Sequence, residues 1–112
     1  MNYSEMSDFE INKAVAIAEG HSCYYGEGSF TNGLMGRKVT VKGNGVMGCM
    51  DFCNSWADAG PIIEKENISL TCHQSRDEWA AIFNRNAMAA HSNPLRAAME
   101  CCLIKKEREN AA

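Results

Sequence analysis

The most constraining feature of this sequence is a long amphipathic helix signal near its C-terminal end. Asn93 is a good N-cap, and Pro94 suits the first helical position, where a missing N–H breaks no helical hydrogen bond. Apolar residues then recur at helical spacing and form one stripe, made of Leu95, Ala98, Met99, Cys102 and Leu103. The pattern predicts a helix over residues 94–108, with Arg96 and Glu100 elsewhere on the wheel. Such a stripe has to be covered, so the rest of the chain must supply a partner surface.

A second helix is signalled at the other end of the chain. Ser7 and Glu10 form a capping box, in which the Ser7 hydroxyl accepts from the Glu10 amide and the Glu10 carboxylate reaches back. The apolar stripe here is Ile11, Ala14, Val15 and Ala18. Gly20 follows as a natural C-terminal stop, so we predict a helix over residues 8–19.

Between these helices, the first signals are those of a hairpin. Residues 37–42 alternate polar and β-branched side chains, as a half-buried strand does. Asn44-Gly45 is a strong hairpin turn, and a return strand is predicted from Val46. Residues 21–36 are predicted as a loop, with room for a short strand around 29–32.

The second half of the middle segment predicts a short helix and a strand pair. Gly60-Pro61 is predicted to start the helix, with Pro61 at its first position and Asn67 at its end. Residues 68–72 and 78–83 are predicted as antiparallel strands joined by a short polar stretch, and residues 84–92 as a loop. The order helix, hairpin, short helix, two strands, helix predicts the α+β class. We expect a small single domain over residues 1–112, with an antiparallel sheet packed with the N-terminal and C-terminal helices.

The composition narrows the classes of function that this chain can have. The 112 residues carry 11 Lys+Arg against 14 Asp+Glu, a net charge of −3, and the basic residues are spread out. Nucleic-acid binding usually shows a clustered basic face, so this balance counts against it. No apolar run approaches the ~20 residues that span a bilayer, and the first residues carry neither a basic nor an apolar leader. We therefore expect a cytoplasmic protein with no membrane partner.

The cysteines are expected to be reduced thiols, because disulfides are rare in the cytoplasm. Most are interpreted as small core hydrophobes; the six are Cys23, Cys49, Cys53, Cys72, Cys101 and Cys102. The spacing of Cys49 and Cys53 is not that of a zinc knuckle, so no metal is predicted. A zinc site or a Cys–His nucleophilic pair assembled in space is the lesser alternative.

One glycine motif resembles a cofactor site. Gly43, Gly45 and Gly48 match the dinucleotide-binding pattern, but the helix that should follow is missing. The hairpin explains the same glycines, so no cofactor is predicted.

The densest unexplained stretch precedes and includes Gly60-Pro61. Its predicted binding residues are Asn54, Ser55, Trp56, Asp58, Gly60 and Pro61. In the functional interpretation, Trp56 stacks on a planar group while Asn54 and Asp58 supply hydrogen bonds beside free helix amides. In the structural interpretation, Asp58 caps or precedes the helix and Trp56 belongs to the core.

The same stretch carries a family resemblance. The run from Cys53 to Ile63, followed by Glu66-Asn67-Ile68-Ser69, resembles the NinX-like family of small phage and prophage proteins. Residues 93–99 look like that family's closing helix and residues 6–16 like its first helix. Trp79 stands where the family has a tryptophan. The resemblance implies a phage accessory protein in the bacterial host cytoplasm and implies no particular reaction.

Three functional hypotheses follow. The first is a non-enzymatic binding module that acts on a host protein or on a small polar, nucleotide-like ligand. The second is a small enzyme acting on a nucleotide-type substrate, with Asp58 or His73 as acid or base. The third is an accessory of DNA replication or recombination, against which the acidic charge counts. Self-association into a homo-oligomer is left open.

Overall fold

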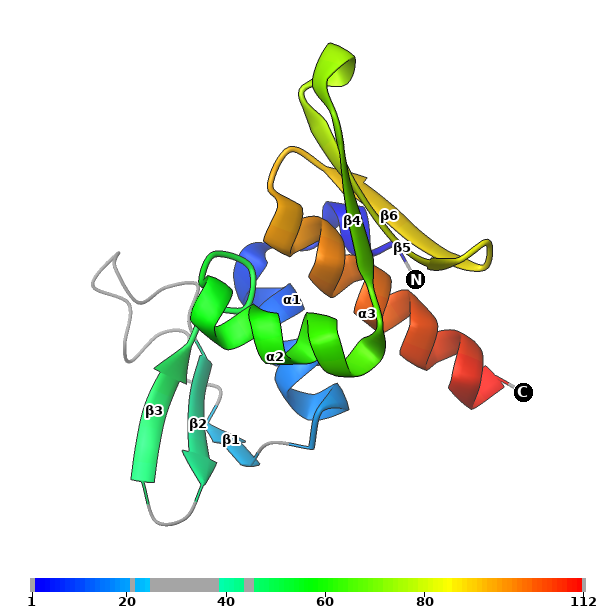
Figure 1. Cartoon of the computed structure of the whole chain (residues 1–112). Helices are drawn as coiled ribbons and strands as arrows, with labels where there is room; N and C mark the ends of the chain where they lie inside the picture. Colours follow the sequence, from blue (N-terminus) through cyan, green and yellow to red (C-terminus); the bar gives the residue numbers. More distant parts are fainter. Residues whose placement is uncertain (1, 21, 25–38, 44–45, 112) are drawn as a thin grey trace.

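The computed structural model describes residues 2–20, 22–24, 39–43 and 46–111. In chain order the elements are η1 (Tyr3–Glu5), α1 (Asp8–Ala18), β1 (Ser22–Tyr24), β2 (Val39–Gly43), β3 (Val46–Met50), α2 (Trp56–Glu66), β4 (Ser69–His73), η2 (Gln74–Arg76), β5 (Glu78–Asn84), β6 (Ala87–His91) and α3 (Pro94–Ala111), as Figure 1 shows. The mixture of helices with antiparallel strands confirms the predicted α+β class.

The two terminal helices begin as predicted. The Ser7 hydroxyl accepts from the Glu10 backbone N–H at 3.1 Å, and the Glu10 carboxylate accepts in return, which confirms the capping box. The Asn93 side-chain oxygen accepts from the N–H of Leu95 at 3.0 Å and caps α3. These signals are local, so they are readable from the sequence alone.

The predicted start of α2 at Pro61 is wrong, because the helix begins at Trp56. The Ser55 hydroxyl accepts from the Asp58 N–H at 3.3 Å and caps the helix one turn earlier. Pro61 then lies inside the helix, where it has no N–H for the carbonyl of Ala57. Both residues are exposed, so water can reach that carbonyl. Asn67 ends the helix in the left-handed conformation, as predicted (φ 59°).

The strands form two three-stranded antiparallel sheets, β1–β2–β3 and β4–β5–β6, rather than the one sheet predicted. β2 and β3 pair as the hairpin predicted, although its turn at residues 44–45 lies outside the described residues. β4 and β5 also pair as predicted.

Two predicted loops contain strands. β1 occupies part of the loop predicted over 21–36, and β6 part of the loop predicted over 84–92. β6 pairs with β5 in register Ile82↔Met88, so a neighbouring strand overrides the weak strand propensity of its alanines. The short strand considered around 29–32 lies outside the described residues.

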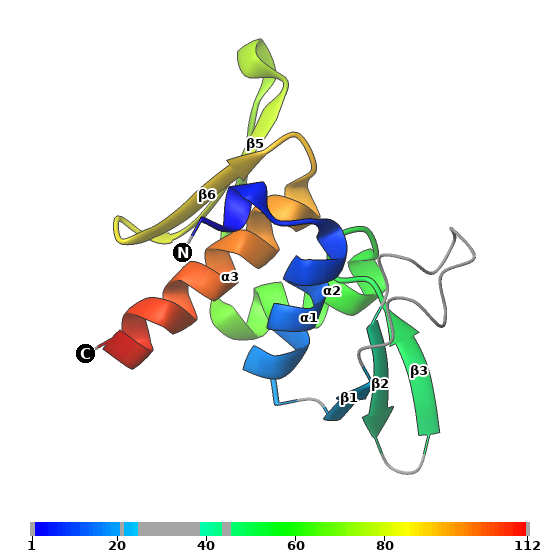
Figure 2. The ribbon, with the colours of Figure 1, turned by 180° about the vertical axis from the view of Figure 1, so that it is seen from behind.

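α3 forms the centre of the molecule. It packs against β5 and β6 on one side and against α1 and α2 on the other, as the two opposite views show (Figures 1 and 2). Its predicted core residues are buried: Leu95, Ala98, Met99, Cys102 and Leu103. Arg96 and Glu100 are buried too, at 4% and 3% exposed, because a helix between two layers has no fully solvated face. Among the described helices, none has both the length and the apolar character needed to cross a bilayer.

Candidate binding site

Asn54, Ser55, Trp56 and Asp58 lie where the N-terminal ends of the three α-helices converge, whereas Gly60 and Pro61 lie in the middle of α2. Residues Asp51 to Ser55, here called the junction turn, connect β3 to α2. The backbone N–H groups of Asn54 and Ser55 donate to the carbonyl of Asp51 at 3.1 and 2.9 Å. Asp8 at the start of α1 and Asn93 at the start of α3 both bond to this turn.

The side-chain amide of Asn54 ties the three helix starts together. Its Nδ2 donates to Asp8 Oδ2 and to Asp51 Oδ1, both at 3.1 Å. Its Oδ1 accepts from Asn93 Nδ2 at 3.1 Å. Asn93 Nδ2 also donates to the carbonyl of Cys53 at 2.8 Å. Asn54 is exposed, but both N–H groups of its amide are already used within the fold.

Ser55 and Asp58 are engaged in the same way. Ser55 caps α2, and the Asp58 carboxylate accepts from the backbone N–H of Asp51 at 3.0 Å. The two side chains therefore stabilise the start of the helix and its link to the junction turn. The interpretation that Asp58 caps or precedes the helix is wrong, because Ser55 is the N-cap and Asp58 lies in the first turn of α2.

A buried part of this network was not predicted from the sequence. Asn12, fully buried in α1, donates through Nδ2 to Asp51 Oδ1 at 2.9 Å. Its Oδ1 accepts from the N–H of Cys53 at 3.0 Å. The available signal was an asparagine, a poor helix former, next to the apolar stripe of α1.

Arg96 fastens the N-terminal segment to α3. Its guanidinium donates to Asp8 Oδ1 at 2.6 Å and to Glu100 Oε2 at 2.7 Å. A third nitrogen donates to the carbonyls of Tyr3 and Met6 at 3.0 and 2.6 Å. A buried charge needs such partners, and here two carboxylates and two carbonyls supply them.

The charge of Asp8 is set by the same contacts. Desolvation raises the pKa of this carboxyl, but hydrogen bonds from Asn54 and Arg96 outweigh it and hold the pKa below the ordinary value of 3.8. Asp8 is therefore ionised at neutral pH and is paired within the fold.

Trp56 is the predicted binding residue that remains open to a partner. Its side chain is 58% exposed at the first position of α2, so the interpretation of Trp56 as a core residue is wrong. Gly60 lies one helical turn further on, and a Cβ built there would meet no atom within 4 Å. Pro61 beside it is exposed. Trp56 directly follows the hydrogen-bonded junction turn.

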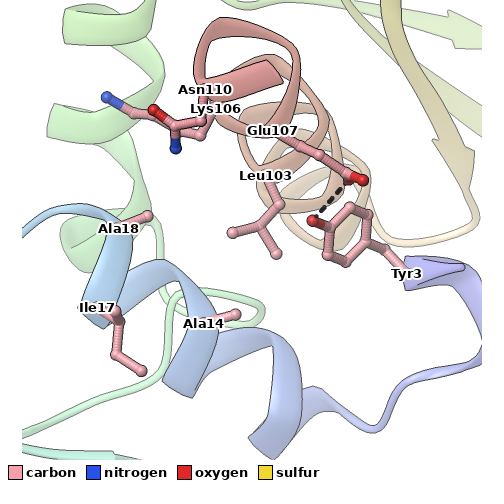
Figure 3. Close-up of a pocket in the computed structure, with 8 residues that line it drawn as sticks. All are labelled: Tyr3, Ala14, Ile17, Ala18, Leu103, Lys106, Glu107 and Asn110. Atoms are coloured by element: carbon pink, nitrogen blue, oxygen red, sulfur yellow. Dashed lines mark hydrogen bonds between the residues drawn. The ribbon is translucent and has the colours of Figure 1, made fainter. Parts of the chain in front are cut away.

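A separate groove lies between α1 and the C-terminal half of α3 (Figure 3). It has a volume of about 610 Å³ and an apolar base that includes Ala14, Ala18 and Leu103. At one end the Tyr3 hydroxyl donates to Glu107 Oε2 at 2.9 Å; desolvation and this bond raise the pKa of Tyr3 to about 12. The predicted binding residues do not line this groove.

In the described part of the chain, no group of three or more His, Cys, Asp or Glu side chains is placed to hold a metal ion. Desolvation raises the pKa of the Cys53 thiol, and it raises that of Cys102 to about 12. A thiolate is the nucleophilic form, so these two buried cysteines are poor nucleophiles at neutral pH.

Comparison with known families agrees with the resemblance noted in the sequence. The family model described as Bacteriophage P22, NinX matches residues 2–106. The match includes the junction turn, all of α2 and the start of α3. No curated protein matches the chain.

Proposed function

Because this chain belongs to the bacteriophage P22 NinX family, we propose that it is a phage accessory protein that binds a host protein through Trp56. The observation that carries the proposal is the exposure of Trp56, at 58%, at the first position of α2, directly after a turn fixed by hydrogen bonds. Tryptophan is enriched among the residues that contribute most to protein–protein binding. A residue on a rigid backbone loses little conformational entropy on binding, because the backbone is already ordered before the partner arrives.

A protein partner fits this surface better than a small polar ligand. Such a ligand needs free hydrogen-bonding groups around the indole. The amide of Asn54, the hydroxyl of Ser55 and the carboxylate of Asp58 are engaged within the fold. An apolar or planar side chain from a partner needs only the exposed face of the indole.

The enzymatic alternative has less support in the geometry. Asp58 lies in α2 and bonds to the junction turn, whereas His73 ends β4. The end of β4 stands at the tip of the β4–β5 hairpin, away from the start of α2 in both views (Figures 1 and 2). Asp58 and His73 therefore cannot act together as an acid–base pair in one site. The net charge of −3 favours a protein partner over DNA.

In-cell photo-crosslinking tests the proposal. A benzophenone amino acid replaces Ala57, which is exposed beside Trp56, and the protein is produced in the bacterial host. We expect a covalent adduct with one host protein that disappears when Trp56→Ala is added. The same probe at Gln74, exposed on η2, is the matched control and should not give that adduct.

Two outcomes would contradict the proposal. One is the absence of any Trp56-dependent adduct at position 57, with Trp56→Ala still folded by circular dichroism. The other is a shift of the Trp56 indole N–H resonance on titration of the purified protein with nucleotides, which would support the small-ligand hypothesis instead.

A further inference from the structure

The proline inside α2 leaves one backbone acceptor of that helix without its usual donor. In an α-helix, the carbonyl of one residue accepts from the N–H four residues further on. Pro61 has no N–H, so the carbonyl of Ala57 lacks that donor within α2. Ala57 and Pro61 are both exposed. The first half of α2 therefore presents a backbone oxygen to which a bound group can donate.

This oxygen belongs to the residue that follows the exposed indole. Trp56 and Ala57 are consecutive, so their Cα atoms lie about 3.8 Å apart. One side chain of a partner can contact both residues if it combines a planar face for the indole with N–H donors for the carbonyl. The guanidinium group of arginine has this combination, because it is planar, carries five N–H donors and stacks on aromatic rings.

The charges around the start of α2 favour a cation. The carboxylate of Asp58, in the first turn of this helix, bonds to the junction turn, and so does that of Asp8. Arg96 pairs with Asp8 and with Glu100. These described groups thus comprise three carboxylates and one guanidinium. A guanidinium group from a partner would complement this excess of negative charge.

We propose that the host protein presents an arginine side chain at this place, with the guanidinium group stacked on Trp56 and donating to the carbonyl of Ala57. This arginine contact rests on the proposed function, since it specifies the chemistry of the partner at the same site. It also gives Pro61 a role. A proline in a helix interior weakens the helix, and here it keeps the acceptor open for the partner.

An NMR titration of the purified chain with the peptide acetyl-Gly-Arg-Gly-amide tests the arginine contact. We expect the indole N–H resonance of Trp56 to shift and that of Trp79 in β5 to stay, with a dissociation constant of about 10 mM or below. The control peptide carries citrulline, which is planar and donates hydrogen bonds but has no charge. It should bind at least about fivefold more weakly. Equal binding of the two peptides, or no shift with the arginine peptide, would overturn the arginine contact.

The variant Pro61→Ala tests the role of the carbonyl. Its new N–H can donate to the carbonyl of Ala57, which closes the acceptor within the helix. We expect the variant to unfold at a higher urea concentration, because alanine suits a helix interior and proline does not. It should bind the arginine peptide about tenfold more weakly, and its higher stability excludes unfolding as the cause. An unchanged affinity would overturn the proposed hydrogen bond.

The crosslinking at position 57 separates this arginine contact from the proposed function. If the Trp56-dependent adduct forms but the arginine peptide does not bind, the arginine contact is wrong and the host-protein proposal stands. If the adduct does not form, the host-protein proposal fails, and the arginine contact with a host protein fails with it.

Discussion

At the scale of single residues, the four cysteines with described surroundings fall into two kinds. Cys72 in β4 is exposed, whereas Cys53, Cys101 and Cys102 are fully buried. Desolvation raises the pKa of all three buried thiols, so little thiolate forms at neutral pH. We predict that iodoacetamide labels Cys72 before these three in the native protein, as read by peptide mass spectrometry.

The control is the same labelling in denaturant without a reductant. Under those conditions all six cysteines should react, since reduced thiols are expected throughout. Labelling of Cys53 as fast as Cys72 in the native protein would show that the junction turn opens, contrary to its dense hydrogen bonding.

The residue scale also shows where sequence reasoning works. The caps at Ser7 and Asn93 were predicted because each bonds to an N–H two or three positions away. Asn12 and Asp51 are 39 positions apart, and no local pattern relates them. Trp56 was identified as a candidate, but the engagement of Asn54 depends on Asp8 in α1 and on Asn93, which lies 39 positions further along the chain.

At the scale of elements, α3 is the helix on which the others pack. Met99 is fully buried at its centre, so Met99→Ala should lower the free energy of unfolding by about 2–5 kcal/mol. Ile17→Ala on the exposed side of α1 is the control and should change it by about 0.5 kcal/mol or less. Urea denaturation measures both changes in the free energy of unfolding. Equal changes for the two variants would mean that α3 is not the buried central helix.

The two elements predicted wrongly have different physical causes. Pro61 was placed at a helix start because proline suits that position, yet the stronger cap at Ser55 starts α2 earlier. β6 was predicted as a loop because alanine and methionine favour no strand on their own. Its pairing with β5 decides the outcome, and that pairing is visible only in three dimensions.

At the scale of the whole molecule, ion pairs between distant elements make stability depend on pH. In Asp8 and Glu66, desolvation raises the pKa, but hydrogen bonds outweigh it and lower the pKa below 3.8 and 4.5. The bonds come from Asn54 and Arg96 in the first case and from Lys105 and Lys106 in the second, with Lys105 Nζ 2.9 Å from Glu66 Oε1.

A carboxyl whose pKa is lower in the folded state stabilises the fold above its unfolded pKa. That stabilisation is lost as pH falls through the folded pKa. We predict that the urea midpoint is steady near neutral pH and falls below about pH 4.5. The double variant Asp8→Asn, Glu66→Gln should be less stable at neutral pH and should lose less on acidification. If the variant loses as much stability on acidification as the unmodified protein does, other groups cause the acid sensitivity.

The α+β class and single domain were predictable at this scale, because the order of elements limits how they can pack. The position of α3 between two layers was not. Arg96 and Glu100 look like solvent-facing residues on a helical wheel, and their burial follows only from elements packed on both sides.

The hydrogen bonds around the junction turn can form only late in the synthesis of the chain. Arg96 and Asp8 are 88 positions apart, and Asn93 reaches back 40 positions to the carbonyl of Cys53. A nascent chain therefore cannot form these hydrogen bonds until the start of α3 has left the ribosome. Before that moment the start of α2, which carries Trp56, lacks the hydrogen bonds that tie the junction turn to α3.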